Sequence, residues 1–580
     1  MKEKKQRGLL RYLDGFWRQS ILAPLFKLLE ALFDLLVPLV VAEIINVGIN
    51  QGDTGVILRC CGLLVLLGVV GLACSITAQW FAAQAAIGYA SAMRHDLFRH
   101  IQTLDFSQVD VLGGSTLITR LTSDINQVQN GLNMFLRLFM RSPFIVFGSV
   151  VLAFTIDWKV ALVFVVTVPV LSLIVFGLMR LTSPMYRRNQ DQLDSVLRLT
   201  RENLTGVRVV RAFGQEQAEE TRFRQENQRL TNMQLKVGRL SALMNPMTYA
   251  VVNLGVVAVL YVGARQVEGG VLLNGDIYAL VNYMSQILVE LVKLANTIVL
   301  TTKAMACAGR VKSILAVKPQ MRFPAQKVSV QGDEAVSFRH VGLTYAGADG
   351  ESLRDISFSL RKGQTLGIIG GTGSGKTGVV HLISRFYDAT SGQVSLFGRP
   401  IGDYPKDQVR GMVGVVMQRA QLFAGTIRSN LLWGNRDAAD QELWDALETA
   451  QAADFVRAKP LGLDEPVEQG GRSLSGGQRQ RLTIARALVK KPDILILDDS
   501  ASALDFATDA ALRKALRALP GDLTVVIVSQ RTSSIQHADQ ILVLDDGRQV
   551  GLGSHETLLD TCPVYREIYE SQFKKGGEGA

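Results

Sequence analysis

The sequence predicts an all-α transmembrane domain of six helices with long cytosolic helical extensions, followed by an α/β domain built around a phosphate-binding loop. Three observations predict this fold class. Long apolar runs fill the first half of the chain, and short β-rich segments alternate with amphipathic helices in the second half. The third observation is the glycine-rich pattern GGTGSGKT at residues 370–377. The 580 residues also exceed the roughly 150 residues typical of one domain.

Composition places the first half in a membrane. Hydrophobic residues make up 48% of the chain and charged residues 20%, and the charges are unevenly spread. Much of the excess behind the net charge of +10 lies among the apolar runs of the first 320 residues. This placement fits anionic lipid headgroups better than nucleic acid, so a lipid bilayer is an expected partner and nucleic acid is not. Five cysteines and six histidines show no ligand spacing, so no metal centre built from them is predicted.

Six apolar runs predict six membrane spans. They lie at about 21–49, 60–90, 136–156, 160–180, 241–264 and 275–300. The stretches 60–93 and 240–264 contain no charged residue, and each exceeds the roughly 20 residues that a spanning helix needs. The alternative, buried helices of a soluble protein, is disfavoured by the number of such runs.

The connections between the spans predict their orientation. Loops near residues 51, 157–159 and 266–268 are short and carry few basic residues, whereas those at 94–137 and 180–239 are long and rich in arginine. The long loops read as helical, and the positive-inside rule puts them and both termini in the cytosol of a multi-pass plasma-membrane protein. Residues 1–20 interleave basic and apolar side chains. This pattern is typical of an amphipathic segment on the cytosolic face and not of a cleavable signal.

The first span carries charges that an apolar span lacks. Glu30 and Asp34 are four residues apart and share one helix face. Carboxylates within a membrane are candidates for a cation or proton path. The alternative is that they line a wet cavity or the cytosolic mouth without a specific role, and we favour that alternative.

The chain divides at the end of the last apolar run. We predict an N-terminal segment at 1–20, the transmembrane domain at 21–318, a linker at 319–334, the nucleotide-binding domain at 335–575 and a flexible tail at 576–580. Prolines near the boundary, and the loss of long apolar runs there, support the linker. Strands of a partly parallel sheet are expected at Val336–Phe338, Gln364–Ile369, Ile494–Leu497 and Thr524–Val528.

The glycine-rich pattern stands where a buried strand, 365–369, turns into a helix, 379–383. Glycines let backbone N–H groups curl around phosphate oxygens, Lys376 supplies a cation for the outer phosphates, and the Thr377 hydroxyl can ligate Mg²⁺. Asp498 closes a second strand, where its carboxylate can hold Mg²⁺ through water. The predicted nucleotide contacts in this loop are Gly370, Gly371, Thr372, Gly373, Ser374, Gly375, Lys376 and Thr377.

Further motifs then give a resemblance. Leu474-Ser475-Gly476-Gly477-Gln478 reads LSGGQ, Gln418 follows a short apolar run, Ser502-Ala503-Leu504-Asp505 follows the Asp498 strand, and Tyr345 lies about 25 residues before the phosphate loop. In this order they resemble the ABC transporter family, specifically exporters that fuse a six-helix membrane domain ahead of a P-loop ABC ATPase domain.

The resemblance implies the remaining roles. Tyr345 stacks on adenine, and Gln418 touches Mg²⁺ and the membrane-domain loops. Residues 206–214 form a coupling helix. The metal ligands are then Thr377, Gln418 and Asp498, and the cofactors are ATP and Mg²⁺. Two ATPase domains of this family sandwich two nucleotides, so the signature residues Ser475, Gly476, Gly477 and Gln478 contact nucleotide held by a second, homologous half-transporter.

Departures from the family pattern concern hydrolysis. The catalytic Glu expected after Asp498 is Asp499, which is shorter by one methylene, and misplacement of about 1 Å can cost about 100-fold in rate. The switch histidine is Gln530, whose amide does not titrate near neutral pH. The segment 467–471 also lacks the usual Gly-Glu-Arg-Gly order. We therefore expect an ATP hydrolase coupled to transport, in which this chain's own site is slow and a heterodimeric partner supplies the working residues. A homodimer with two slow sites is the alternative.

The expected substrate is a small amphipathic or hydrophobic compound, of the multidrug type, exported from the cytosol. Met134, Phe135, Phe139 and Met140 fit such a compound, a lipid or a peptide, although residues of this kind at helical spacing are more often packing. Glu30 and Asp34 slightly favour cationic compounds. A leader-processing peptide exporter is not expected. An ATP-gated regulatory membrane protein and an importer remain alternatives.

Overall fold

A computed structural model describes residues 8–330 and 332–573. The chain forms two compact units. The first comprises the chain up to Gln102 together with Ser115–Val317. The second comprises Thr103–Gly114 and the chain from Lys318 onward, so a short segment from between two long helices packs with the C-terminal half.

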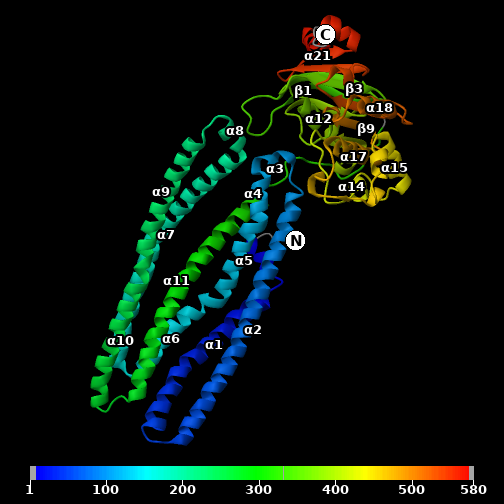
Figure 1. Ribbon diagram of the computed structural model, residues 1–580. Coiled ribbons are helices and arrows are strands. Elements are labelled where there is room, and N and C mark those ends of the chain that lie inside the picture. The colour runs from blue at the N-terminus through cyan, green and yellow to red at the C-terminus, as the bar shows by residue number, and fades with distance from the viewer. Residues whose placement is uncertain (1–7, 331, 574–580) are drawn as a thin grey trace. The chain divides into compact units, whose positions relative to one another are not determined.

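The first unit is built from long helices (Figure 1). Helices α7 and α9 run side by side and are joined through α8. Its main hydrophobic core lies between α1, α6, α7, α10 and α11, where small and aliphatic side chains are fully buried. The helical elements are η2 (Gly8–Leu13), α1 (Trp17–Glu43), η3 (Ile44–Ile49), α2 (Thr54–Ile101), α4 (Gly114–Thr119), η4 (Arg120–Asp124), α5 (Ile125–Met134), η5 (Phe135–Phe139), α6 (Arg141–Ile156), α7 (Trp158–Thr205), α8 (Val207–Ala212), α9 (Glu216–Ala242), α10 (Met244–Glu268) and α11 (Asn274–Ala316).

Within residues 8–330 and 332–573, five helical stretches are long and apolar enough to cross a membrane, and each contains one of the second to sixth predicted spans. They are Thr54–Ile101, Gly114–Ile156, Trp158–Thr205, Glu216–Glu268 and Asn274–Ala316. The first predicted span differs. It lies in α1, of 27 residues, and η3, of six, and is not among these five stretches.

The start of the first helix needs a correction. Helix α1 already begins at Trp17, before the predicted start at residue 21. In the described part of the N-terminal segment, Tyr12 is buried with its ring edge on Tyr89, at 5.9 Å between ring centroids, and Arg11 pairs with Asp96 at 3.1 Å. Residues 8–13 therefore contact α2 through these two side chains while Gly8, Leu10 and Arg11 remain exposed, and their place on the cytosolic face stays a prediction. The basic residues at positions 2–7 lie outside the described residues.

The second unit contains a ten-stranded mixed sheet in the order β5-β4-β1-β2-β12-β11-β3-β10-β9-β6. Strands β11, β3, β10, β9 and β6 run parallel, while β1 pairs antiparallel with β2 and β4, which confirms the partly parallel sheet. The strands are β1 (Glu334–Leu343), β2 (Leu353–Arg361), β3 (Thr365–Gly370), β4 (Ser391–Leu396), β5 (Arg399–Pro400), β6 (Val413–Val416), β9 (Ile494–Asp498), β10 (Thr524–Val528), β11 (Gln540–Asp545) and β12 (Arg548–Gly553), with β7 (Gly425–Thr426) and β8 (Pro466–Val467) forming a separate pair.

Both faces of the parallel strands are covered. Along β9, Ile494 and Ile496 belong to one hydrophobic core, while Leu495 and Leu497 belong to the other, as the two-residue period of a strand requires. The helices and short helical turns of this unit are α3 (Phe106–Leu112), α12 (Lys376–Ile383), η6 (Ile401–Asp403), α13 (Lys406–Met412), α14 (Ile427–Leu431), α15 (Asp440–Thr449), α16 (Ala453–Arg457), η7 (Gly462–Asp464), η8 (Gln469–Gly471), α17 (Gly476–Val489), η9 (Ser500–Ala503), α18 (Phe506–Arg517), α19 (Thr532–Ile535), α20 (His555–Thr561) and α21 (Pro563–Phe573).

The strand register positions the site. Val528 of β10 lies opposite Asp498 of β9 on one side and Ile368 of β3 on the other. The carboxyl ends of these three parallel strands therefore meet at one edge of the sheet. Between Ala316, the end of α11, and Glu334, the start of β1, the described residues form neither helix nor strand. The predicted tail, 576–580, lies outside the described residues.

Candidate functional site

The phosphate-binding pattern forms a loop between β3 and α12, as its sequence predicted. Lys376 is the first residue of α12, and its Nζ donates to the carbonyls of Gly370 at 2.9 Å and Gly371 at 2.6 Å. It also lies 3.3 Å from Oγ of Ser374, which is buried. The ammonium group is thus held over the loop. Because α12 begins here, its unpaired N–H groups face the same loop, where an anion is favoured.

Three positions in this loop require glycine. A Cβ on Gly370 would stand 2.1 Å from the carbonyl oxygen of Leu544, which is backbone and cannot move aside. Gly373 has φ +84° and Gly375 has φ +95°, and a Cβ on Gly375 would stand 2.7 Å from the carbonyl oxygen of Ser352. Gly371 has open space around it. The outer part of the loop, residues 371–373, is exposed together with Thr377.

Asp498 and Asp499 follow one another at the end of β9. Asp498 is 5% exposed, and burial together with the neighbouring Asp499 raises the pKa of its carboxyl to about 6. Burial lowers the pKa of Lys376, although both aspartates oppose that change. The two carboxylates and the ammonium group therefore interact electrostatically at the edge of the sheet. The sequence predicted the phosphate and Mg²⁺ contacts at this edge.

Asp499 is held by its backbone. Its N–H donates to the carbonyl of Val528 at 3.0 Å, and its own carbonyl accepts from the N–H and hydroxyl of Ser502 at 3.2 and 2.7 Å. The residue has φ +45°, in the left-handed region. Nε2 of Gln418 donates to its Oδ2 at 3.3 Å. The structure thus brings together Gln418 and Asp499, which are 81 residues apart in the sequence.

The signature residues begin helix α17. Ser475 is its N-cap: the hydroxyl accepts from the N–H of Gln478 at 3.2 Å, and the Gln478 side chain accepts from the N–H of Ser475 at 3.0 Å. This reciprocal capping box orders the turn and satisfies the N–H of Gln478, while it leaves the N–H groups of Gly476 and Gly477 outside the box. A Cβ on Gly477 would stand 3.1 Å from the carbonyl of Ala503, whereas one on Gly476 would meet nothing within 4 Å. Ser475 and Gly476 are exposed, so they are open to a ligand from outside this chain.

Tyr345 and Gln530 complete the predicted set. Tyr345 lies two residues after β1 and is half-buried, with its hydroxyl 3.0 Å from Nδ1 of His381. Gln530 lies two residues after β10 and is exposed, and its carbonyl accepts from Nε2 of Gln572 at 2.7 Å. Gln530 therefore follows β10, the neighbour of β3 in the sheet, whereas Tyr345 follows β1, which is not adjacent to β3.

Comparison with known proteins gives the family. The model of the ABC transporter transmembrane region matches residues 20–291, and the ABC transporter model matches residues 353–502. An uncharacterized ABC transporter ATP-binding protein of Mycobacterium tuberculosis is 36% identical over 575 residues, which covers 97% of each chain. The chain belongs to the ABC transporter family. It is an exporter-type half-transporter, with its membrane domain fused ahead of its ATPase domain.

Two further comparisons extend this result. An ATP-dependent lipid A-core flippase of Photobacterium profundum is 31% identical over 518 residues, covering 88% of this transporter and 87% of the flippase. The solved structure of a bacterial Atm1-family ABC exporter with ATP bound has a TM-score of 0.78 and 24% identity, and covers 96% of this chain and 98% of that one. The transporter therefore shares its fold along nearly the whole chain. An ABC ATPase domain binds ATP and couples ATP hydrolysis to transport.

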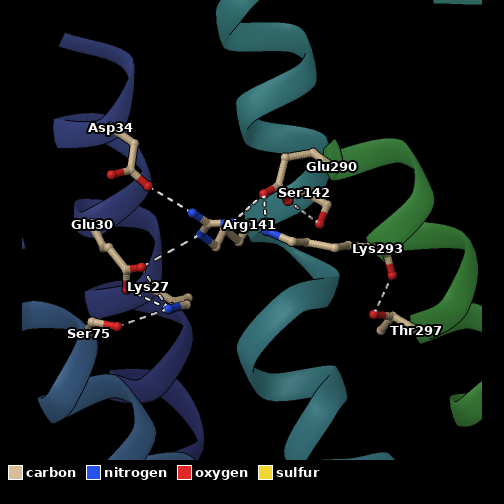
Figure 2. Close-up of polar contacts among 9 residues, drawn as sticks. All are labelled: Lys27, Glu30, Asp34, Ser75, Arg141, Ser142, Glu290, Lys293 and Thr297. Atoms are coloured by element: carbon tan, nitrogen blue, oxygen red, sulfur yellow. Dashed lines mark hydrogen bonds and ion pairs between the residues drawn. The ribbon is translucent and has the colours of Figure 1, made fainter. Parts of the chain in front are cut away.

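The transporter's helical unit holds a second polar cluster (Figure 2). Lys27 donates to both carboxylate oxygens of Glu30, at 2.8 and 2.6 Å. Arg141 donates to Asp34 at 2.8 Å and to Glu290 at 2.5 Å. Glu290 also accepts from Ser142 at 2.7 Å and from Lys293 at 3.0 Å. We call this set, with Ser75, the ionic network: three cations and three carboxylates that join α1, α2, α6 and α11.

The ionic network bears on the predicted roles of Glu30 and Asp34. The side chain of Glu30 is 13% exposed and already paired, whereas that of Asp34 is 46% exposed. Both carboxylates are therefore paired within the helical unit, and the alternative that we favoured, in which they have no specific transport role, stays a prediction. Sequence reasoning missed Arg141 and Glu290, although each is a charge inside a predicted span and buried charges require partners.

A third group was also missed. His381, Tyr387 and Asp110 connect Tyr345 to helix α3 by hydrogen bonds and ring contacts. Tyr387 and Asp110 are 277 residues apart, so no sequence spacing points to their contact.

Proposed function

We propose that this transporter is one half of a heterodimeric ATP-driven exporter, in which the chain's own phosphate loop binds ATP but hydrolyses it slowly. Its LSGGQ signature then completes the competent site on a homologous partner. Amphipathic or hydrophobic compounds leave the cytosol, and the protein lies in the plasma membrane with both termini and the ATPase domain on the cytosolic side.

The observation that carries this proposal is the fixed backbone of Asp499. Moving its Cα outward by about 1 Å, to replace the missing methylene, would break the bonds to Val528 and Ser502. Each such bond contributes about 1 kcal/mol, so the shorter side chain cannot easily be compensated by the backbone. The carboxylate is therefore too short to reach an attacking water as a glutamate would.

The binding of ATP is supported by intact parts of the same site. Lys376, the glycines at 370 and 375, and the start of α12 present a cationic loop for the phosphates. Oxygen donors that suit Mg²⁺ are the Thr377 hydroxyl, the Gln418 amide and the Asp498 carboxylate, whose pKa is raised by burial and by the neighbouring Asp499. These residues would hold the ion, which neutralises phosphate charge. The cationic loop would bind the phosphates of the nucleotide.

The signature supports a role toward a partner. Ser475 and Gly476 are exposed, and the capping box fixes the turn that presents them. The Ser475 hydroxyl, which can still donate its hydrogen, and the N–H groups at the helix start suit a phosphate held by another chain. The LSGGQ residues themselves carry no departure from the family pattern, unlike the segment 467–471 before them, so the composite site that they complete can be active.

A lipid is the second candidate substrate. Two observations favour it: a relative named ATP-dependent lipid A-core flippase is 31% identical to this chain over 518 residues, and the helices carry large exposed apolar side chains. An amphipathic lipid combines apolar and charged parts, as the expected drug-like substrates do. ATP-driven flipping of lipid from one leaflet to the other separates this candidate from drug export. It is measured in sealed vesicles with labelled lipid and MgATP.

The subunit composition of the complex tests the proposal. The chain is tagged, extracted gently from its host membrane, and the intact assembly is weighed by native mass spectrometry. The expected result is a second, different chain of similar size that carries Glu and His at the positions of Asp499 and Gln530. An assembly of two copies of this chain alone would overturn the heterodimer, because Asp499 would then have to support all hydrolysis.

A further inference from the structure

A continuous chain of side-chain contacts runs from Tyr345 to helix α3 within the second unit. The Tyr345 hydroxyl lies 3.0 Å from Nδ1 of His381. The His381 ring stacks on Tyr387, with centroids 5.2 Å apart and planes at 26°. The Tyr387 hydroxyl donates to Oδ2 of Asp110 on α3. We call these four residues the Tyr345–Asp110 chain.

The aromatic members also contact one another directly. The rings of Tyr345 and Tyr387 meet edge to face, with centroids 5.0 Å apart at 89°. Such aromatic pairs contribute about 0.5–1.5 kcal/mol beyond their buried area, and they fix the relative orientation of the rings. Phe106, on the same helix as Asp110, packs on Phe386 with centroids 4.6 Å apart. Helix α3 is thus held at two neighbouring points on the segment that follows α12.

His381 occupies the junction of three parts of the ATPase unit. It lies on α12, one helical turn after Thr377, so it shares a rigid helix and one helix face with the phosphate loop. Its Nδ1 contacts the tyrosine expected to stack on adenine, and its ring face contacts the tyrosine that holds α3. Burial lowers the pKa of His381, so the imidazole is neutral at pH 7 and Nδ1 can accept from the Tyr345 hydroxyl.

We propose that His381 is a positioning residue that couples Tyr345 to Asp110, so that adenine stacking on Tyr345 and the seating of α3 stabilise each other. This inference rests on the proposed binding of ATP to this chain's own phosphate loop. A base that stacks on Tyr345 limits the ring to one orientation. That orientation keeps the hydroxyl on His381, which holds Tyr387 and its bond to Asp110.

Linkage makes the coupling measurable with MgATP alone. If adenine stacking favours the hydrogen bond to Asp110, then the loss of Asp110 must lower the affinity for MgATP by the same factor. The effect requires His381 and should be absent for tripolyphosphate with Mg²⁺, which occupies a phosphate loop but has no base to stack. Asp110 is exposed, so its replacement does not threaten the fold.

The experiment is a double-mutant cycle on the complete transporter in lipid nanodiscs. MgATP affinity at this chain's site is measured for wild type, Asp110→Ala, His381→Phe and the double variant. Asp110→Ala is expected to lower the affinity for MgATP about fivefold or more, which is within the usual range of coupling between two sites. In the His381→Phe background, which keeps a ring against Tyr387 but loses Nδ1, the same change is expected to have less than a twofold effect. His381→Asn, which restores an acceptor near Nδ1, should recover part of the coupling.

Two controls separate the possible failures. Gln108→Ala removes a different contact of α3, the 2.6 Å bond to the carbonyl of Lys318, and should leave MgATP affinity within twofold. Tyr345→Ala should weaken the binding of MgATP but not the binding of Mg²⁺-tripolyphosphate. An equal effect of Asp110→Ala in both His381 backgrounds would overturn the coupling while leaving ATP binding intact. No effect of Tyr345→Ala would instead remove the adenine contact on which the inference rests.

Discussion

The N–H of Asp499 donates to the carbonyl of Val528 at 3.0 Å, so a residue of the β9 end is fastened to the end of the neighbouring strand β10. Because Ser502 holds the carbonyl of Asp499 as well, the Cα position of this residue is determined on both sides. The length of the side chain alone then decides how far its carboxylate reaches. This relationship turns a one-methylene difference in sequence into a difference in reach at the site.

Restoring that length should raise hydrolysis at this chain's own site. In a Gly476→Asp background, which disables the composite site on the partner, Asp499→Glu with Gln530→His is expected to raise the remaining ATP turnover about tenfold to 100-fold. The reason is that Asp499→Glu restores the reach of the carboxylate, and Gln530→His supplies an imidazole that titrates near neutral pH. Phosphate release by the reconstituted complex measures it. An unchanged rate would show that side-chain length does not limit this site.

The glycines of the phosphate loop offer a matched pair. Gly370→Ala places a Cβ 2.1 Å from the carbonyl of Leu544, whereas Gly371→Ala places one in open space. Overpacking of this kind costs about 1–3 kcal/mol, so Gly370→Ala should weaken MgATP binding about tenfold or more. Gly371→Ala should change it less than twofold. Binding of labelled ATP in nanodiscs distinguishes them, and equal affinities of the two variants would contradict the described loop.

The ionic network predicts a specific rescue. Arg141→Met leaves the partly exposed Asp34 without its cation and removes one of two cations from the buried Glu290, so the loss of stability should lie below the roughly 3–5 kcal/mol for breaking a fully buried pair. Thermal unfolding in detergent should therefore show a clearly lowered midpoint, whereas replacing the exposed Arg180 by Met should change it little.

Adding Asp34→Asn to Arg141→Met should restore part of the lost stability, because the pairs Lys27–Glu30 and Lys293–Glu290 then leave the cluster neutral. If the second change lowered the midpoint further, Asp34 and Arg141 would not be partners.

Much of the fold follows from sequence because its signals are local. The length of the apolar runs predicted the spans that lie in α2, α6, α7, α10 and α11. Short β-rich runs predicted β1, β3, β9 and β10. The phosphate loop was also predicted, since its glycines, lysine and threonine are consecutive. The start of α1 was misplaced because the charged and aromatic residues at 11–18 resemble a surface segment, while Tyr12 packs on a residue 77 positions away.

What sequence did not predict depends on side chains from distant segments. Arg141 neutralises Asp34 and Glu290 on two other helices, and Tyr387 bonds to Asp110 from the other half of the chain. Neither contact leaves a spacing in the sequence. The fixed backbone of Asp499 is of the same kind, because its anchor, Val528, is on another strand.

The neutral state of His381 predicts a pH effect on stability. Burial holds the pKa of His381 in the folded state below the unfolded value of about 6.5, although Asp110 opposes this shift. As the pH falls through that range, the histidine is protonated in the unfolded chain before it is protonated in the folded protein, which favours unfolding. Stability of wild type should therefore fall more than that of His381→Phe between pH 7.5 and 5.5. Asp498 has the opposite sign but is common to both proteins and cancels in the difference.

Thermal unfolding at the two pH values measures this effect, with Tyr387→Phe as the control. That variant keeps the histidine, together with its neighbours Tyr345 and Asp110, and should behave like wild type. An equal loss of stability in wild type and His381→Phe would mean that His381 is protonated alike in both states.

The most direct test of the slow-site account compares two substitutions in the native complex. Asp499→Asn removes the carboxylate at this chain's own site, and Gly476→Asp places a negative charge in the exposed signature, where a Cβ meets nothing within 4 Å. Steady-state ATP turnover is measured for each. The account predicts that Asp499→Asn lowers turnover less than twofold, whereas Gly476→Asp lowers it by about 100-fold, the scale expected when a hydrolytic site loses its transition-state contacts. A comparable collapse in both variants would contradict it, because Asp499 would then be a working catalytic residue.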